Sequence, residues 1–150
     1  MSLTTTKTTL LEIARQAADK LKAEERILGY VPENSLAIPG AKFRYRPDLM
    51  IMCKDLKAVV CEIAGYESYK SLFAEAVMST MIPDVKAYLS ILDNWNSDEV
   101  ENANSRFAFV RTKMKTDVSL ECLPISGDYI RPSDISQKVQ TIYNRLLLLV

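Results

Sequence analysis

Apolar residues near the start of the chain recur every three or four positions, a spacing that predicts an amphipathic helix. The inner face of this helix is formed by Leu10, Ile13, Ala14, Ala17, Leu21 and Leu28. We expect the helix to run from about Thr9 to Leu28, with polar side chains on its other face. Thr9 and Glu12 have the spacing of a capping box, and Gly29 stands where a glycine often ends a helix.

Two apolar runs follow a loop that is expected at residues 30–40, where two prolines interrupt any regular pattern and Ser35 to Ile38 can form a short strand. The first run, Lys42 to Cys53, alternates at its start and then becomes continuously apolar. The second run, Leu56 to Ala64, is equally apolar and rich in valine, and Lys54-Asp55 lies between the two. This pattern predicts a β-hairpin whose strands are buried on both faces, in the middle of a sheet.

The next segments predict helices and a surface loop. Residues Ser71 to Ile82 are apolar almost all round at helical spacing, and Pro83 interrupts them. The helical pattern resumes from Asp84 to Leu92, so we expect a kinked helix or two abutting helices. Asp93 to Ser105 is polar and acidic, which favours a surface loop.

The last third of the chain predicts two strands and a helix. Arg106 to Thr112 and Val118 to Pro124 are expected to pair as a second hairpin across Lys113 to Asp117, and Ser133 to cap the final helix. The whole order predicts an α/β fold, with one mixed sheet of about four to five strands and helices on both faces. We expect a single domain spanning residues 1–150.

Composition excludes several classes of protein. The 48% of hydrophobic residues and 25% of charged residues fit a folded domain, and Lys+Arg and Asp+Glu balance at 19 each. There is no histidine, which excludes a Ser-His-Asp triad and a Cys/His zinc site. Three cysteines without a CxxC pair predict buried reduced thiols in a cytoplasmic protein. Neither a signal peptide nor a membrane span is expected, because the apolar runs are too short.

Two carboxylates within the apolar hairpin are the strongest candidates for chemistry. Asp48 follows Pro47 at the start of the first apolar run, and Glu62 lies inside the second. A buried charge is costly unless it is paired, hydrogen-bonded or bound to a metal. If the turn leaves Cys53 opposite Lys57, Asp48 faces Glu62, close enough for both to share a divalent cation. That register needs an odd number of turn residues or a bulge, because a two-residue turn would place the carboxylates on opposite faces.

The hairpin resembles the metal-site hairpin of the PD-(D/E)xK nuclease superfamily. The similarity lies in Arg46-Pro47-Asp48-Leu49, an apolar strand, a tight turn and Val59-Val60-Cys61-Glu62-Ile63-Ala64, about twenty residues in all. It is most similar to the N-terminal nuclease segment of type I restriction subunits. The predicted order of elements agrees with the helix–strands–helix–strand core of that restriction endonuclease-like fold.

The resemblance implies a Mg²⁺- or Mn²⁺-dependent hydrolysis of DNA. Asp48 and Glu62 would hold the metal, with the backbone carbonyl of Ile63 as a further ligand. The metal would lower the pKa of a bound water and offset charge on the attacked phosphate. Arg44 and Arg46 would contact the nucleic acid, as part of a local basic patch in a chain of zero net charge.

The sequence departs from the family pattern at the motif lysine, which is Ala64 here. Lys70 is the only nearby replacement, and its alternative is a solvated position near a helix start. Glu12 is a further candidate, since many relatives place a glutamate on the first helix, and its alternative is the capping box. Without a lysine, the chain would be a catalytically inactive member of the same fold, acting as a binding or assembly module.

Other interpretations of the same residues stay open. Asp48 can cap backbone groups at a strand start, and Glu62 can pair with Arg44, Arg46 or Lys70. In that case the chain would be an unrelated α/β interaction protein. The five apolar residues 146–150 predict either a docked last helical turn or a homo-oligomer contact through the C-terminal helix.

Overall fold

The computed structural model of the chain describes residues 3–64, 69–93, 95–125 and 131–150. Its helices are α1 (Leu3–Ala23), α2 (Tyr69–Met81), α3 (Ser97–Met114) and α4 (Pro132–Leu149). Its strands are β1 (Ile27–Pro32), β2 (Leu36–Ala37), β3 (Arg44–Tyr45), β4 (Leu49–Cys53), β5 (Ala58–Ala64), β6 (Val85–Asp93) and β7 (Ser119–Ile125). None of the described helices combines the length and the apolar character that crossing a membrane requires.

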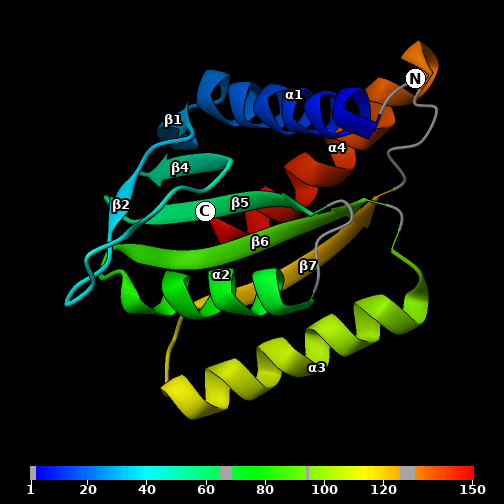
Figure 1. The fold of residues 1–150 in the computed structure, drawn as a ribbon. Coiled ribbons are helices and arrows are strands. Elements are labelled where there is room, and N and C mark those ends of the chain that lie inside the picture. Colours follow the sequence, from blue (N-terminus) through cyan, green and yellow to red (C-terminus); the bar gives the residue numbers. More distant parts are fainter. Residues whose placement is uncertain (1–2, 65–68, 94, 126–130) are drawn as a thin grey trace.

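One mixed sheet of five strands forms the centre of the molecule, in the order β1-β4-β5-β6-β7. The strands β1, β4 and β5 are antiparallel, whereas β5, β6 and β7 run parallel. Helices α1 and α4 cover one face of this sheet, and α2 and α3 cover the other (Figure 1). The predicted fold class, an α/β protein with one mixed sheet between helices, is confirmed.

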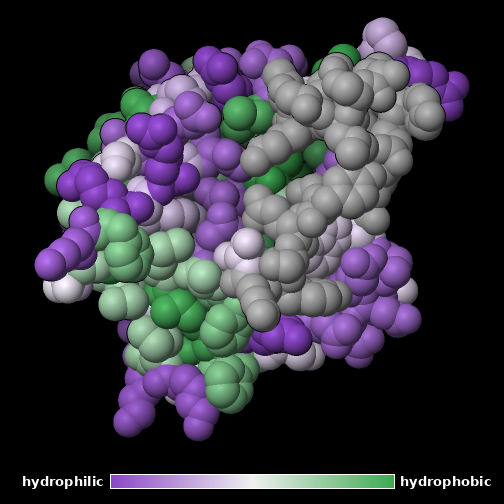
Figure 2. Space-filling view, viewed as in Figure 1, coloured by the Kyte–Doolittle hydropathy of each residue, from purple (hydrophilic) through white to green (hydrophobic). Residues whose placement is uncertain are grey.

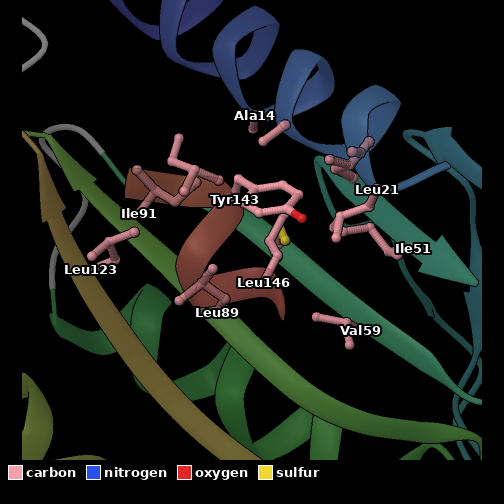
Figure 3. Close-up of a cluster of buried hydrophobic side chains, with 14 of the residues drawn as sticks. Ala14, Leu21, Ile51, Val59, Leu89, Ile91, Leu123, Tyr143 and Leu146 are labelled. Carbon is pink, nitrogen blue, oxygen red and sulfur yellow. The ribbon is translucent and has the colours of Figure 1, made fainter. Parts of the chain in front are cut away.

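The two faces of the sheet bury separate apolar clusters. On one side, Tyr143 and Leu146 of α4 and Leu21 of α1 lie over Ile51, Val59 and Leu89 of the strands (Figure 3). On the other side, α2 and α3 bury Leu72 and Phe107 against the sheet. All seven residues of β5 are buried, which confirms the prediction that the hairpin lies in the middle of the sheet.

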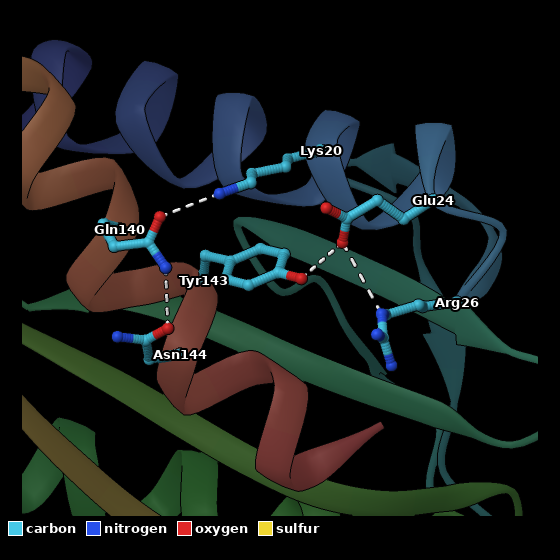
Figure 4. A network of polar contacts seen from close by, with 6 residues as sticks. All are labelled: Lys20, Glu24, Arg26, Gln140, Tyr143 and Asn144. Carbon is cyan, nitrogen blue, oxygen red and sulfur yellow. Dashed lines mark hydrogen bonds and ion pairs between the residues drawn. The ribbon is translucent and has the colours of Figure 1, made fainter.

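Polar contacts above the first cluster join α1 to α4. Lys20 Nζ donates to Gln140 Oε1 at 2.8 Å, and the Tyr143 hydroxyl donates to the Glu24 carboxylate (Figure 4). Glu24 also pairs with Arg26, with 3.5 Å between Nε and Oε1. These contacts set how the two helices lie against each other, because they fix side chains at the rim of the packed face.

The turn of the central hairpin has the predicted odd length. The N–H of Cys53 donates to the carbonyl of Lys57, and the N–H of Leu56 donates to the carbonyl of Cys53, both at 2.9 Å. Three residues, 54–56, therefore form the turn, and Leu56 closes it with a φ of 68°. Met50 pairs with Val60, as the proposed register requires. This register prediction is confirmed.

The predicted bounds of the first helix and its capping box are wrong. Helix α1 begins at Leu3, so Thr9 lies inside it and caps nothing at its start. Glu25 ends the helix in the left-handed region with a φ of 59°, and Arg26 N–H donates to the carbonyl of Leu21 at 2.9 Å. Gly29 lies in β1, where the chain pairs with the buried strand β4. Strand pairing thus overrides the helical spacing of the last predicted turn.

Four predictions for the second half of the chain are also wrong. The segment predicted to be helical at 84–92 is β6, the strand between β5 and β7. Helix α3 replaces the predicted strand at 106–112 and, from Ser97 onward, the predicted loop at 93–105. No second hairpin forms there, because α3 crosses over the sheet and brings β7 parallel to β6. Burial of β6 on both faces removes the alternation that marks a strand in the sequence.

The last two elements agree better with the sequence. Strand β7 covers the predicted 118–124 to within a residue, and α4 buries Ile142, Tyr143 and Leu146 as expected. The predicted cap at Ser133 is wrong, because α4 starts one residue earlier at Pro132 and Arg131 is its N-cap. Proline suits a first helical position, since it has no N–H there to leave unpaired.

Candidate functional site

Asp48 and Glu62 lie side by side where the β4–β5 pair ends. The backbone N–H of Asp48 donates to Glu62 Oε1 at 2.8 Å. In return, Asp48 Oδ2 accepts from the N–H of Ile63 at 2.8 Å. The last paired residues of the two strands are Leu49 and Cys61, so Asp48 is one position beyond them. At this end of the strand pair, side-chain carboxylates therefore accept hydrogen bonds from backbone N–H groups, in the place of backbone carbonyls.

The Glu62 side chain points toward α2 and is almost fully buried, with 4% of the residue exposed. Its Oε1 also accepts from the hydroxyl of Tyr45 at 3.3 Å. The carboxyl of Glu75, on α2, hydrogen-bonds with Glu62, and the Tyr88 hydroxyl donates to Glu75 Oε1 at 3.3 Å. We name these five residues, Tyr45, Asp48, Glu62, Glu75 and Tyr88, the carboxyl cluster.

Burial controls the protonation of the carboxyl cluster. Loss of solvent, together with the hydrogen bond and charge of Glu75, raises the pKa of Glu62 far above its ordinary value, to about 10. The charge of Asp48 acts in the same direction. Glu62 therefore keeps its proton at neutral pH and can donate to Glu75. Burial also raises the pKa of Tyr45 and Tyr88, so both remain neutral hydroxyl donors.

The residues that are present do not fit a Mg²⁺ centre of the implied kind. Magnesium needs ionised carboxylate oxygens in an open, near-octahedral shell. One oxygen of Asp48 and one of Glu62 already accept backbone N–H groups, and burial raises the pKa of Glu62, which disfavours its ionised form. In the part of the chain that the structure describes, no three Cys, Asp or Glu side chains are arranged to hold a metal ion.

The other predicted site residues are placed less closely together. Ile63 turns its side chain into the α1/α4 cluster while its N–H binds Asp48. Arg44 donates from Nε to Ser35 Oγ and from Nη2 to the Ser35 carbonyl, both at 2.9 Å, which fastens β3 to the loop before β2. Arg46 is exposed. Lys70 belongs to the first turn of α2, but its side chain lies outside the described residues.

Two further positions bear on the predicted chemistry. Ala64, at the place of the motif lysine, is fully buried in the cluster under α2 and α3. Glu12 is exposed on α1, where its carboxylate lies 3.8 Å from Arg15. Because α1 covers the opposite face of the sheet from the Glu62 side chain, Glu12 does not join the carboxyl cluster.

Sequence reasoning missed three members of the cluster. Glu75 had a detectable signal, since it is one charged residue within the apolar helical run 71–82. Tyr45 and Tyr88 had none, because a tyrosine on the inner face of a predicted strand or helix is ordinary core composition. Ser90 is the neighbour of Glu62 on β6, and its buried hydroxyl oxygen has no hydrogen-bond partner among the described residues. The site thus depends on packing of α2 and β6 that local patterns do not reveal.

Comparison with protein-family models, curated proteins and solved structures gives no match. The fold and the site therefore define the class on their own. The molecule is an α/β protein with a mixed five-stranded sheet and a buried carboxyl cluster between that sheet and α2.

Proposed function

We propose that this chain is a PD-(D/E)xK-like domain without phosphodiesterase activity, which serves as a binding or assembly module. The burial and hydrogen bonding of Glu62 carry the proposal. This carboxyl is almost fully buried, and its Oε1 already accepts from the Tyr45 hydroxyl and from the backbone N–H of Asp48. A metal-dependent nuclease needs the equivalent carboxylate ionised and open to a cation.

The fold supports the resemblance on which the proposal depends. A helix, antiparallel strands, a helix and a strand parallel to β5 follow one another, as in the core of that superfamily. Asp48, one residue before β4, meets Glu62 of β5 at the register that the motif requires. The family position of the lysine holds the buried Ala64, which removes the group that orients the attacking water.

The compartment is part of the same proposal. Cys53, Cys61 and Cys122 are all buried and unbonded to one another. Burial raises the pKa of each thiol, so each stays protonated and unreactive. Buried free thiols suit a reducing, cytoplasmic setting.

A second candidate function is Mg²⁺- or Mn²⁺-dependent hydrolysis of DNA. The closeness of Asp48 and Glu62 favours it, since a cation between them would displace the proton of Glu62. In that case the carbonyl of Ile63 would add a ligand and Lys70 would take the role of the lysine. Arg44 and Arg46 would then contact DNA phosphates.

A cleavage assay separates the two candidates. Plasmid and single-stranded DNA would be incubated with the chain in Mg²⁺ or Mn²⁺, beside Asp48→Ala and Glu62→Gln. Glu12→Gln is the matched control, because it removes an exposed carboxylate on the opposite side of the sheet. We expect the same background for all four proteins. Cleavage by wild type and Glu12→Gln that both cluster variants lose would establish the hydrolase instead.

A measurement of Mn²⁺ binding tests the proposal without depending on cleavage. Mn²⁺ titrated into the wild-type chain should show no saturable site in calorimetry and no bound-metal signal in electron paramagnetic resonance. A saturable site that releases protons and disappears in Glu62→Gln would contradict the proposal, because metal would then compete with the proton of Glu62.

A further inference from the structure

One face of α3 carries an exposed stripe that the fold leaves uncovered. Its residues are Asp98, Asn102, Ser105, Phe109 and Lys113, which follow one another at intervals of three or four. That spacing places them on one side of the helix, beside the face that buries Ala103, Phe107 and Val110. Phe109 is the one apolar residue of this stripe, and 53% of it is exposed.

A hollow of about 400 Å³ lies beside this stripe, between α2 and α3. It is lined by Phe73, Asn102, Ser105, Arg106 and Phe109. Figure 2 shows apolar side chains gathered over α2, bordered by polar side chains. An aromatic side chain from outside would find an apolar wall at Phe73 and a small residue at Ser105, which permits close approach.

The charges of the stripe are separated along the helix. Asp98 stands at its first turn and Lys113 at its last, so the stripe is acidic at one end and basic at the other. The Lys113 ammonium lies over the Phe109 ring, 5.6 Å from its centroid, which holds it on this face. Such a stripe is complementary to itself when a second copy runs antiparallel.

We propose that a second copy of this chain binds here and forms a two-fold symmetric dimer through α3. With the two-fold axis at Ser105 and Arg106, Asp98 faces the partner's Lys113, and the partner's Phe109 enters the hollow at Asn102. Each contact occurs twice, because the same surface serves both copies. Burial of the two phenyl rings supplies affinity, and the charge pairs set the antiparallel orientation.

The other routes to self-association are less suitable. Edge-to-edge pairing of β7 is hindered, because Arg111 and Arg145 donate to the carbonyls of Leu120 and Cys122 at 3.3 Å and 3.5 Å. The apolar C-terminal helix has already docked Leu146 into the core. What it leaves exposed is chiefly Leu148, with 82% of the residue open to solvent.

Sedimentation equilibrium of the full chain over a wide concentration range tests the dimer. We expect wild type to associate reversibly, and Asp98→Lys or Lys113→Asp alone to weaken association roughly tenfold by placing like charges opposite each other. An equimolar mixture of the two variants should recover wild-type association, because both charge pairs re-form in the mixed dimer. The double variant should recover it as well.

The controls separate this interface from unrelated effects. Circular dichroism of each variant excludes loss of α3, whose first turn favours an acidic residue. Glu12→Lys reverses a charge on the far side of the sheet, and Leu148→Lys removes the exposed apolar residue of α4, so neither should change association. The proposal is overturned if wild type is monomeric throughout, if the mixture fails to recover association, or if Leu148→Lys alone dissociates the dimer.

Discussion

Glu62 keeps a proton that most glutamates have lost at neutral pH, because the sheet and α2 exclude water from it and Glu75 lies against it. The neutral acid has a structural use, since it can donate to Glu75 while its Oε1 accepts from Tyr45 and from the backbone of Asp48. Each partner in this chain of hydrogen bonds comes from a different element. Protonation therefore links β3, β5 and α2.

The raised pKa of Glu62 makes stability depend on pH in a defined direction. The folded state holds this proton up to about pH 10, whereas the unfolded chain releases it near the ordinary value of 4.5. The free energy of unfolding therefore falls as pH rises from about 5 to 9, by at most about 1.4 kcal/mol per pH unit from this group. Glu62→Gln keeps a hydrogen-bond donor and an acceptor but has no proton to release. The variant should therefore lose this dependence of the free energy of unfolding on pH.

Urea denaturation of wild type and Glu62→Gln from pH 5 to pH 9 measures the effect. The variant should be near wild type at the acidic end and increasingly more stable than wild type toward the alkaline end. Glu12→Gln, on the exposed face of α1, controls for the loss of a carboxylate. A difference between Glu62→Gln and wild type that stays constant over this range would show that Glu62 is ionised in the folded state.

The three-residue turn between β4 and β5 shows how one strained residue sets the geometry of a pair of strands. Leu56 has a φ of 68°, a conformation that costs a residue with a side chain about 1–2 kcal/mol. Its side chain gains little in return, because 68% of the residue is exposed. Glycine adopts this conformation without strain.

Leu56→Gly should therefore raise the free energy of unfolding by about 0.5–1 kcal/mol, after the extra entropy of the unfolded chain is subtracted. Thermal and urea unfolding measure the change. Lys54→Gly is the matched control in the same turn, and it should lower stability because Lys54 has no left-handed backbone to relieve. A Leu56→Gly variant that unfolds more easily than wild type would contradict this account of the turn.

The same turn explains why the central hairpin could be predicted from the sequence. Its strands are contiguous, its apolar runs are long, and burial of both faces leaves one register that brings Asp48 to Glu62. Glu75 and Tyr88 could not be placed in this way, because they reach Glu62 only through packing of α2 and β6. Local sequence therefore predicted two of the carboxylates and missed their surroundings.

The predictions for β6 and α3 were wrong for two different physical reasons. Strand β6 lies between two parallel neighbours, so its apolar run has no alternation and fits a buried helix equally well. Helix α3 was hidden because Phe107 and Phe109 alternate with small or polar residues, as in a strand. The decisive signal was the capping box of Asn96 and Glu99, whose two hydrogen bonds measure 2.9 Å and 3.1 Å.

At the scale of the whole molecule, one sheet serves two apolar clusters. Residues of β5 alternate between them, with Val59 in the α1/α4 cluster and Val60 in the α2/α3 cluster. If either cluster lost its packing, water would reach one face of the strands whose other face packs in the second cluster. We expect the chain to unfold as a single cooperative unit.

Leu146→Ala tests this coupling, because Leu146 is fully buried in the α1/α4 cluster. The reporter is Trp95, the only tryptophan in the chain, which packs against the cluster on the other side of the sheet. The substitution should cost about 2–5 kcal/mol, the usual range for a leucine removed from a core. Trp95 fluorescence and far-ultraviolet circular dichroism should report the same lowered urea midpoint, although α3 and its surroundings are untouched. Leu148→Ala, on the exposed side of the same helix, should change stability by no more than about 0.5 kcal/mol. If the fluorescence midpoint stayed at the wild-type value while the dichroism midpoint fell, the two clusters would unfold separately and the shared sheet would not couple them.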